Sequence, residues 1–257
     1  MIGMFDSGVG GLSVLLAVRR LLPGAALVYV ADSAWFPYGS REPPALAERT
    51  AAITRFLLGE GARLVVVACN SASGTAITHL RATFPIPFVG VEPAVKVAVD
   101  SGTMGRIGVL CTPMTARAER YHDLVARVAR SREKEVVTVA SEVLAGVVER
   151  GEHLLPGIAE VVERELQPLL QAQIDAVVLG CTHYAFLAGL VRQLSGLPVL
   201  EPSFAVARQV QRLYGLAAPS DEGASVIYTT GDVGRLAAFC REHEGLADLP
   251  VRRLELG

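Results

Sequence analysis

Two stretches of the chain end a short apolar run on a cysteine that hydrogen-bonding residues follow. They are "ARLVVVACNSAS" at residues 62–73 and "IDAVVLGCTHYA" at residues 174–185. Two thiols held on opposite faces of one carbon atom can move a proton between those faces, because one acts as a thiolate base while the other donates as a thiol. Such a pair inverts a stereocentre without a cofactor. Cys69 and Cys181 are therefore candidate catalytic residues.

A cysteine needs help from its surroundings to work as a base. A free thiol has a pKa of about 8.5, and a helix that begins directly after it favours the thiolate through its dipole and its unpaired backbone N–H groups. The same N–H groups bind anions, so they could hold a substrate carboxylate. Cysteine is also among the most buried residue types, so a single cysteine at a strand end is more often part of a core. The matching positions of Cys69 and Cys181 favour the catalytic interpretation. Cys111 and Cys240 lack such a polar setting and are predicted to be structural.

The glycine-rich stretch "DSGVGGLS" at residues 6–13 follows the first apolar run. It does not fit G-x-G-x-x-G, because Ser13 stands at the position of the third glycine, and it lacks the Gly-Lys-Ser/Thr ending of a P-loop. The stretch instead predicts a tight turn from a strand into a helix that brings Asp6 and Ser7 to the site. Asp6 then either poises Cys69 or contacts a substrate ammonium group, and a helix-capping role for Asp6 or Ser7 is compatible with this.

Several polar residues near these segments are further candidates. Asn70, the one asparagine of the chain, and Ser71 follow Cys69. His183 is interpreted as an acid/base partner or a ligand for substrate charge, although a lone histidine is more often structural. The turn "PYGS" at residues 37–40 offers a tyrosine hydroxyl and a glycine backbone to a ligand. Glu92 and Glu201, each before a proline, suit a structural role and a place in the site equally well.

Short apolar runs alternate with amphipathic segments along the chain. This pattern predicts βαβ units with parallel strands and right-handed crossovers. The expected strands are 1–5, 26–31, 64–68, 87–90, 106–110, 136–140, 175–180, 197–200 and 225–229. The expected helices are 11–22, 43–60, 72–83, 114–130, 155–172, 185–195, 204–214 and 233–243.

The chain is also internally repeated. "IGMFDSG" (2–8) is similar to "IGVLCTP" (107–113), and "PFVGVEPA" (87–94) is similar to "PVLEPSFA" (198–205), at nearly the same offset as the two cysteine segments. We expect two similar α/β domains, 1–96 together with the tail 208–257, and 97–207. Ligands of open parallel sheets bind at the carboxyl ends of strands. If a pseudo-twofold axis relates the domains, Cys69 and Cys181 face each other across one cleft.

Composition excludes several other classes. The net charge of −2 gives no basic surface for nucleic acid or for a membrane, and no apolar run is long enough to span one. The start of the chain does not resemble a signal peptide, so we expect a cytoplasmic protein whose cysteines are thiols. No cysteine or histidine spacing predicts a zinc site. Only Lys96 and Lys134 occur, and Lys134 lies in a charged run, so a pyridoxal phosphate enzyme is not favoured. No cofactor is expected.

Taken together, these motifs resemble those of the glutamate racemases, cofactor-independent enzymes that supply D-glutamate for peptidoglycan. The matching segments are "FDSGVGGLSV", "ADSAWFPYGSR", "VVVACNSAS", "VGVEPA", "VLGCTHY" and "YTTGDVGRL", in order from residue 2 to about 236. The resemblance implies that Cys69 acts on D-glutamate and Cys181 on L-glutamate, and that the protein is a homodimer. It places the substrate-binding residues at Asp6, Ser7, Tyr38, Gly39, Asn70, Ser71, Thr182 and His183. It places an auxiliary acidic residue at Glu149.

The chain departs from the family pattern at three places. Ser71 replaces a threonine but keeps the hydroxyl, Ala185 replaces a proline, and "ASEVLAG" (140–146) replaces a Cys-Pro segment before Glu149. Racemases of aspartate or hydantoin stay open as alternatives, as do arylmalonate decarboxylases and maleate isomerases. The presence of both cysteines argues against the decarboxylases, which use one. A non-catalytic module that binds an amino acid is an alternative from a different class.

Overall fold

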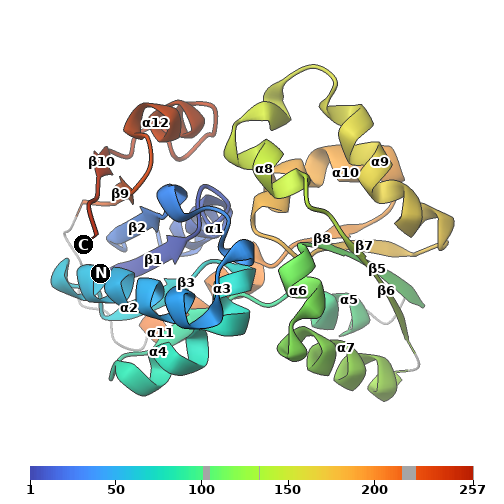
Figure 1. Ribbon diagram of the computed structural model, residues 1–257, viewed down its shortest axis with the longest axis horizontal. Coiled ribbons are helices and arrows are strands. Elements are labelled where there is room, and N and C mark those ends of the chain that lie inside the picture. Colours follow the sequence, from blue (N-terminus) through green and yellow to red (C-terminus); the bar gives the residue numbers. More distant parts are fainter. Residues whose placement is uncertain (101–104, 133, 216–223, 257) are drawn as a thin grey trace. The chain divides into compact units, whose positions relative to one another are not determined.

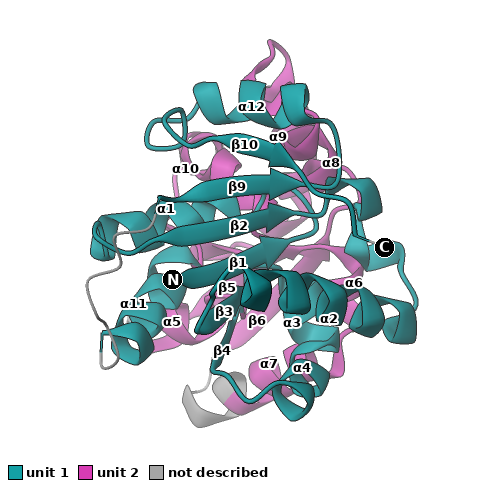
Figure 2. Ribbon diagram, turned by 90° about the vertical axis from the view of Figure 1, so that its left-hand side faces the viewer, with its two compact units in different colours: residues 1–91, 203–257 teal, residues 92–202 magenta. Residues whose placement is uncertain are grey.

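The computed structural model describes residues 1–100, 105–132, 134–215 and 224–256 (Figure 1). The chain forms two compact units (Figure 2), of which unit 1 is Met1–Val91 with Ser203–Gly257 and unit 2 is Glu92–Pro202. Each unit is built around one parallel β-sheet. The α/β class expected from the sequence is confirmed.

Unit 1 has a sheet in the order β10-β9-β2-β1-β3-β4, and every strand pair in it is parallel. Its strands are β1 (Ile2–Asp6), β2 (Leu27–Ala31), β3 (Leu64–Val67), β4 (Phe88–Gly90), β9 (Val226–Thr229) and β10 (Val251–Arg253). All residues of β1, β2 and β3 are buried. Continuous apolar runs form strands of this kind because helices cover both faces of the sheet.

The helices of unit 1 are α1 (Leu12–Leu21), α2 (Pro43–Gly59), α3 (Asn70–Thr75), α4 (Ile77–Thr83), α11 (Ser203–Tyr214) and α12 (Val233–Arg241), with 3-10 turns η1 (Ser33–Trp35) and η2 (Tyr38–Ser40). Apolar residues of α2, α3 and α4 pack with Phe5 and Val67 in one core cluster. Met4 alternates with Phe5 along the strand and so points to the other face. There α1 packs against α11 and β2.

Unit 2 has a four-stranded parallel sheet in the order β6-β5-β7-β8. Its strands are β5 (Arg106–Cys111), β6 (Glu135–Ala140), β7 (Ala176–Leu179) and β8 (Val199–Leu200). Its helices are α5 (Val95–Asp100), α6 (Pro113–Arg117), α7 (Glu119–Arg132), α8 (Leu144–Glu149), α9 (Ile158–Gln171) and α10 (Ala188–Ser195), with 3-10 turns η3 (Glu152–Leu154) and η4 (His183–Leu187).

The two faces of this second sheet pack on different helices. Val109 and Cys111 belong to a core cluster with residues of α5 and α7. Gly108 faces the opposite side, where a Cβ atom added to it would lie 2.4 Å from Ile174 Cδ1 and 3.2 Å from Leu169 Cδ2 of α9. A glycine is therefore required in β5 because α9 and the segment after it lie close to the strand.

The internal repeat expected from the sequence appears as one strand order used twice. The order β2-β1-β3-β4 in unit 1 matches β6-β5-β7-β8 in unit 2. In both sheets the strand before a candidate cysteine, β3 or β7, lies between the leading strand of its unit and the strand that precedes a Glu-Pro pair. The two cysteines therefore hold equivalent positions in their own units.

Some predicted helices are divided in the structure. The expected helix 72–83 is α3 and α4, which meet at Ala76, and the expected helix 114–130 is α6 and α7, separated by the extended residue Ala118. The segment 185–195 begins as η4 and continues as α10. The short helices α5 and α8 and the largely exposed strand β10 were not predicted, because three to six residues are too few to show a period.

Both boundaries between the units lie five residues before the expected ones, at 91/92 and 202/203 rather than at 96/97 and 207/208. The first differs because α5 packs on α7 and β5 of unit 2, and the second because α11 starts at Ser203 and packs on α1. The C-terminal tail returns to unit 1 as expected, since β9 pairs with β2 and β10 pairs with β9. Among the described residues, no helix has the length and apolar character needed to cross a membrane.

Five buried phenol and thiol groups predict a steep loss of stability at high pH. Burial is the largest cause that raises the pKa of Tyr38, Tyr121 and Tyr184 and that raises the pKa of Cys111 and Cys240 to about 12. In the unfolded chain these groups ionise near pH 8.5 (Cys) and 10 (Tyr), so above those values the unfolded state releases protons that the folded state keeps. Each group then removes about 1.4 kcal/mol of unfolding free energy per pH unit.

We therefore expect denaturant unfolding to give a nearly constant free energy around neutral pH and a steep fall above pH ~9. The variant Cys240→Ala provides the matched comparison, because it removes one of the five groups and should flatten the slope by about 1.4 kcal/mol per pH unit between pH ~9 and 12. A wild-type unfolding free energy that stays level up to pH ~11 would contradict the prediction.

Candidate active site

The first candidate cysteine lies at the carboxyl ends of neighbouring strands in unit 1. Asp6 is the last residue of β1, and Cys69 follows the end of the adjacent strand β3. The Cys69 thiol donates to Ser7 Oγ over 4.0 Å, and Asp6, Ser7 and Cys69 are all buried. Cys69 also directly precedes α3, as the sequence predicted. The structure therefore brings Asp6, Ser7 and Cys69 together from two segments that are 62 residues apart.

The Asp6 carboxylate organises the glycine-rich turn. Its Oδ1 accepts from the backbone N–H of Ser7 at 2.6 Å and from Ser7 Oγ at 3.2 Å, and its Oδ2 accepts from the N–H of Gly11 at 2.5 Å. A Cβ atom on Gly11 would lie 2.8 Å from both Ala68 Cβ and the Tyr29 hydroxyl. The turn is therefore tight at Gly11 because other residues pack against it. Asp6 both fixes the turn and contacts the hydroxyl beside Cys69, so its capping role is compatible with the role in the site that the sequence suggested.

Asn70 has an unusual environment for a polar residue. Its side chain is buried, and within the described part of the chain neither its amide nitrogen nor its amide oxygen has a hydrogen-bond partner. Leaving such a group unsatisfied costs about 1–3 kcal/mol, and unsatisfied groups in native structures call for an explanation such as a functional role. Ser71 follows it in the first turn of α3 and is also buried. The position beside Cys69 marks Asn70 as a group available to a polar ligand.

Tyr38 is in the same core cluster as Cys69, but its hydroxyl has a partner within the protein. It donates to Asp32 Oδ2 at 2.8 Å, so the ligand contact that the sequence suggested would have to use the phenol oxygen as an acceptor. Burial, followed by the negative charge of Asp32 and the hydrogen bond to it, raises the pKa of Tyr38 well above 10.0, so the phenol stays a neutral donor. Gly39 is exposed in the 3-10 turn η2 that Tyr38 begins.

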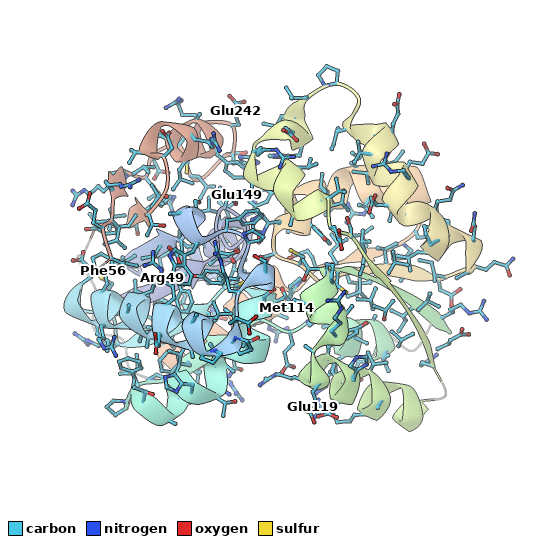
Figure 3. The ribbon with its side chains drawn as sticks, viewed as in Figure 1. Arg49, Phe56, Met114, Glu119, Glu149 and Glu242 are labelled. Atoms are coloured by element: carbon cyan, nitrogen blue, oxygen red, sulfur yellow. The ribbon has the colours of Figure 1, made fainter. Side chains whose placement is uncertain are left out.

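Asp32 is the centre of a buried network that the sequence analysis missed. Besides Tyr38, it accepts from Arg49 Nε at 2.9 Å and Nη2 at 2.7 Å, and from Thr230 Oγ1 at 2.7 Å. Arg49 projects from α2 and is labelled in Figure 3. The one local signal for Asp32 was an acidic residue directly after an apolar strand, as for Asp6. Arg49 and Thr230 are 17 and 198 residues away from Asp32, so no local pattern identified them.

The second candidate cysteine lies in the equivalent place of unit 2. Cys181 follows β7 and Gly180, and its Sγ lies 3.9 Å from Nδ1 of His183. Nε2 of the same ring lies 2.9 Å from Oε2 of Glu149, the last residue of α8 (Figure 3). Thr182 is buried between Cys181 and His183 in the sequence. The Cys181 thiol, the His183 imidazole and the Glu149 carboxylate thus form a series, although Glu149 lies 32 and 34 positions before the other two residues.

This series determines which ring nitrogen of His183 faces Glu149 and which faces Cys181. An ionised carboxylate can only accept, so its contact with Nε2 favours a ring proton on Nε2. In the neutral ring, Nδ1 then carries no proton and faces the sulfur of Cys181. A neutral ring in this tautomer can take the thiol proton and return it. The arrangement in unit 2 can therefore hold and move a proton at one sulfur atom.

The remaining candidates have structural surroundings. Cys111 and Cys240 are buried in their cores, in agreement with a structural role. Glu92 forms a surface ion pair with Arg120, which favours the structural interpretation of this residue. Among the described residues, no group of three or more His, Cys, Asp or Glu side chains is arranged to hold a metal ion.

The comparisons with known proteins assign the chain to a family. The family described as Asp/Glu/Hydantoin racemase matches residues 13–210. The chain belongs to this family. It is 39% identical over 254 residues to the glutamate racemase of Pseudomonas syringae pv. tomato, covering 95% of this chain and 91% of the relative. It is 42% identical over 262 residues to that of Roseiflexus sp., covering 99% and 94%. Relatives at this coverage make the chain an isomerase of the racemase family.

Solved structures support the same assignment. Escherichia coli glutamate racemase, in complex with L-glutamate and the activator UDP-MurNAc-ala, superposes with a TM-score of 0.89 at 30% identity, over 100% of this racemase and 98% of that chain. The Thermus thermophilus enzyme in complex with β-chloro-D-alanine gives 0.78 at 33% identity, over 99% and 96%. An allantoin racemase from Klebsiella pneumoniae, at 21% identity and a TM-score of 0.55, shares the fold.

Proposed function

We propose that this racemase interconverts L- and D-glutamate by proton transfer at Cα between Cys69 and Cys181, without a cofactor. The observation that carries the proposal is the equivalence of the two cysteines. Each lies at the carboxyl end of the corresponding strand of its unit, each is buried, and each has a polar partner backed by a carboxylate. The glutamate racemases that match over the full chain support glutamate as the substrate.

The proposed reaction needs the two thiols on opposite sides of the Cα atom of the substrate. For D-glutamate, the Cys69 thiolate removes the Cα proton, and the Cys181 thiol protonates the opposite face to give L-glutamate. Cys69 then holds the proton as a thiol and Cys181 is the thiolate, so the enzyme is ready for the reverse reaction. The atoms and charges balance without any other reactant.

The polar neighbours of each thiol would serve in binding and proton transfer. In unit 1, Asp6 and Ser7 support Cys69, and the unsatisfied amide of Asn70 supplies both a donor and an acceptor for the substrate ammonium and carboxylate groups. Ser71, Tyr38 and Gly39 complete the substrate-binding set of this unit in the proposal. In unit 2, Thr182 joins His183 as a binding residue.

Glu149 and His183 would assist Cys181 in catalysis. The imidazole lies between the thiol and the carboxylate, so it can accept the proton of Cys181 as the thiolate forms, and the carboxylate stabilises the imidazolium. This gives Cys181 a base of its own, whereas Cys69 depends on Ser7 and Asp6.

In the cell, the proposed product is D-glutamate for peptidoglycan synthesis, and hence for cell-wall biogenesis and cell shape. We propose a cytoplasmic homodimer. All four cysteines are free thiols in the structure, which supports a reducing compartment. The names of the relatives support D-glutamate as the product, and the family resemblance supports both the metabolic role and the homodimer.

The test is racemisation of glutamate by the purified protein in deuterium oxide, with no pyridoxal phosphate and after dialysis against a metal chelator. We expect the optical activity of either enantiomer to decay to zero, with deuterium appearing at Cα of the newly formed enantiomer. L-Aspartate is the control substrate and should react far more slowly. An amino-acid-binding module would exchange no deuterium, faster reaction with aspartate would reassign the substrate, and a requirement for added cofactor or metal would contradict the two-thiol reaction.

A further inference from the structure

The hydroxyl of Tyr184 links the turn that follows β7 to the ends of β5 and β6. Tyr184 is buried in η4, which follows β7, and its hydroxyl donates to the backbone oxygen of Ser141 at 3.1 Å and approaches that of Cys111 at 3.4 Å. Ser141 follows β6 and its N–H donates to the Cys111 oxygen at 2.9 Å, while Cys111 ends β5. One side chain next to His183 therefore contacts the ends of β5 and β6.

Ser141 in turn determines where α8 begins. Its buried Oγ accepts from the N–H groups of Leu144 at 3.2 Å and Val143 at 3.3 Å, and Leu144 is the first residue of α8. The first N–H groups of a helix have no partner within the helix, so this oxygen satisfies two groups that would otherwise lack one. Because α8 has only six residues, the position of its first turn also determines the position of its last residue.

That last residue is Glu149, whose carboxylate holds the ring of His183. The helix α8 packs on η4, which carries both His183 and Tyr184. The contacts thus form a closed series from Tyr184 through Ser141 and α8 to Glu149, and back to His183. A displacement of about 1 Å at a catalytic group is enough to lower a rate strongly.

We propose that Tyr184 and Ser141 are positioning residues that set the Glu149–His183 hydrogen bond and so the proton transfer at Cys181. The proposal rests on the proposed two-thiol function. It adds that Ser141, within the segment where this chain departs from the family pattern, orients the carboxylate partner of the Cys181 imidazole. Neither Tyr184 nor Ser141 is proposed to donate or accept a proton in the reaction.

The test compares Tyr184→Phe with Tyr121→Phe. Tyr121 is a second buried tyrosine of unit 2, and its hydroxyl lies 2.6 Å from Thr138 Oγ1, which is not a member of the series that leads to Glu149. Ser141→Ala is the second variant, in case Tyr184→Phe does not fold. Its control is Asp232→Ala, which removes a side-chain cap from α12 of unit 1.

The first readout is the deuterium isotope effect on kcat/KM for each enantiomer labelled at Cα. The equilibrium constant between enantiomers is one, so kcat/KM must fall equally in both directions, here by about tenfold. If only proton transfer at Cys181 is slowed, removal of the Cα proton from L-glutamate limits the rate more strongly. The isotope effect then rises with L-glutamate and falls with D-glutamate. A general loss of folded protein changes neither isotope effect. Isotope effects like those of the control variants, or a rise with both enantiomers, would overturn the proposal.

The second readout does not depend on activity. The ring nitrogens of His183, assigned in long-range ¹H–¹⁵N spectra from their loss in His183→Gln, should shift in Tyr184→Phe toward their values in Glu149→Gln and stay unchanged in Tyr121→Phe. An unchanged His183 spectrum in both folded variants, Tyr184→Phe and Ser141→Ala, would overturn the positioning role even if glutamate is racemised. A shifted spectrum in a protein that never racemises glutamate would instead refute the proposed function.

Discussion

Replacement of Cys69 or of Cys181 by alanine is expected to abolish the racemisation of glutamate while the protein stays folded. Each thiol is the only group proposed to exchange a proton with its face of Cα, and general acid–base groups contribute about 10²–10⁴ to a rate. Because the reaction needs both thiols in every turnover, either change alone should lower kcat by at least about 10³-fold. The decay of optical activity measures the rate, and denaturant unfolding measures stability.

The two structural cysteines provide the control for this experiment. Cys111→Ala and Cys240→Ala also remove one buried sulfur each, from the cores of units 2 and 1. They should reduce stability at least as much as the site variants do, and retain activity in proportion to the folded fraction. Wild-type activity in Cys69→Ala or in Cys181→Ala would refute the two-thiol mechanism outright.

The substitution Asp6→Asn is expected to lower turnover by about 10²-fold and the unfolding free energy by about 1–2 kcal/mol. The carboxylate accepts from two backbone N–H groups and from Ser7 Oγ, and an amide in its place has one acceptor oxygen. The turn therefore loses at least one hydrogen bond. The larger effect is on the rate, because the negative charge beside Ser7 and Cys69 disappears.

Asp175→Asn separates these two effects. Asp175 likewise accepts from two backbone N–H groups, those of Gly105 at 2.6 Å and Arg106 at 2.8 Å, but it precedes β7 and so lies at the opposite end of that strand from Cys181. This variant should weaken folding and leave the turnover per folded molecule unchanged. If Asp6→Asn behaves in the same way, Asp6 is a turn residue without a part in proton transfer.

The sequence was most informative where chemistry and local structure coincide. The apolar runs before Cys69 and Cys181 identified β3 and β7, because a strand buried on both faces needs a continuous apolar stretch. The similar spacing of motifs in the two halves indicated the repeated strand order. The glycine-rich stretch also predicted a tight turn. The structure gives the reason for a glycine there, because the close approach of other residues to Gly11 leaves no room for a side chain.

Contacts between residues far apart in the sequence could not be predicted in this way. The partners of Asp32 come from α2 and from the end of β9, and nothing in the local pattern around Arg49 or Thr230 indicates them. The hydrogen bond from the Tyr38 hydroxyl to Asp32 spans only six residues, but the sequence around it does not indicate in which direction that hydroxyl points. Glu149 was suggested by resemblance, but its distance to His183 depends on α8, a helix too short to predict.

The return of the C-terminal tail to the first sheet has a consequence for synthesis on the ribosome. Residues 92–202 form a continuous unit and can fold as soon as they emerge, because domains generally fold as units during translation. The sheet that carries Cys69 has to wait, with β2 as an uncovered edge until Val226–Thr229 is made and pairs with it. Thr230 then reaches Asp32, so the environment of Tyr38 is completed by one of the last segments to be translated.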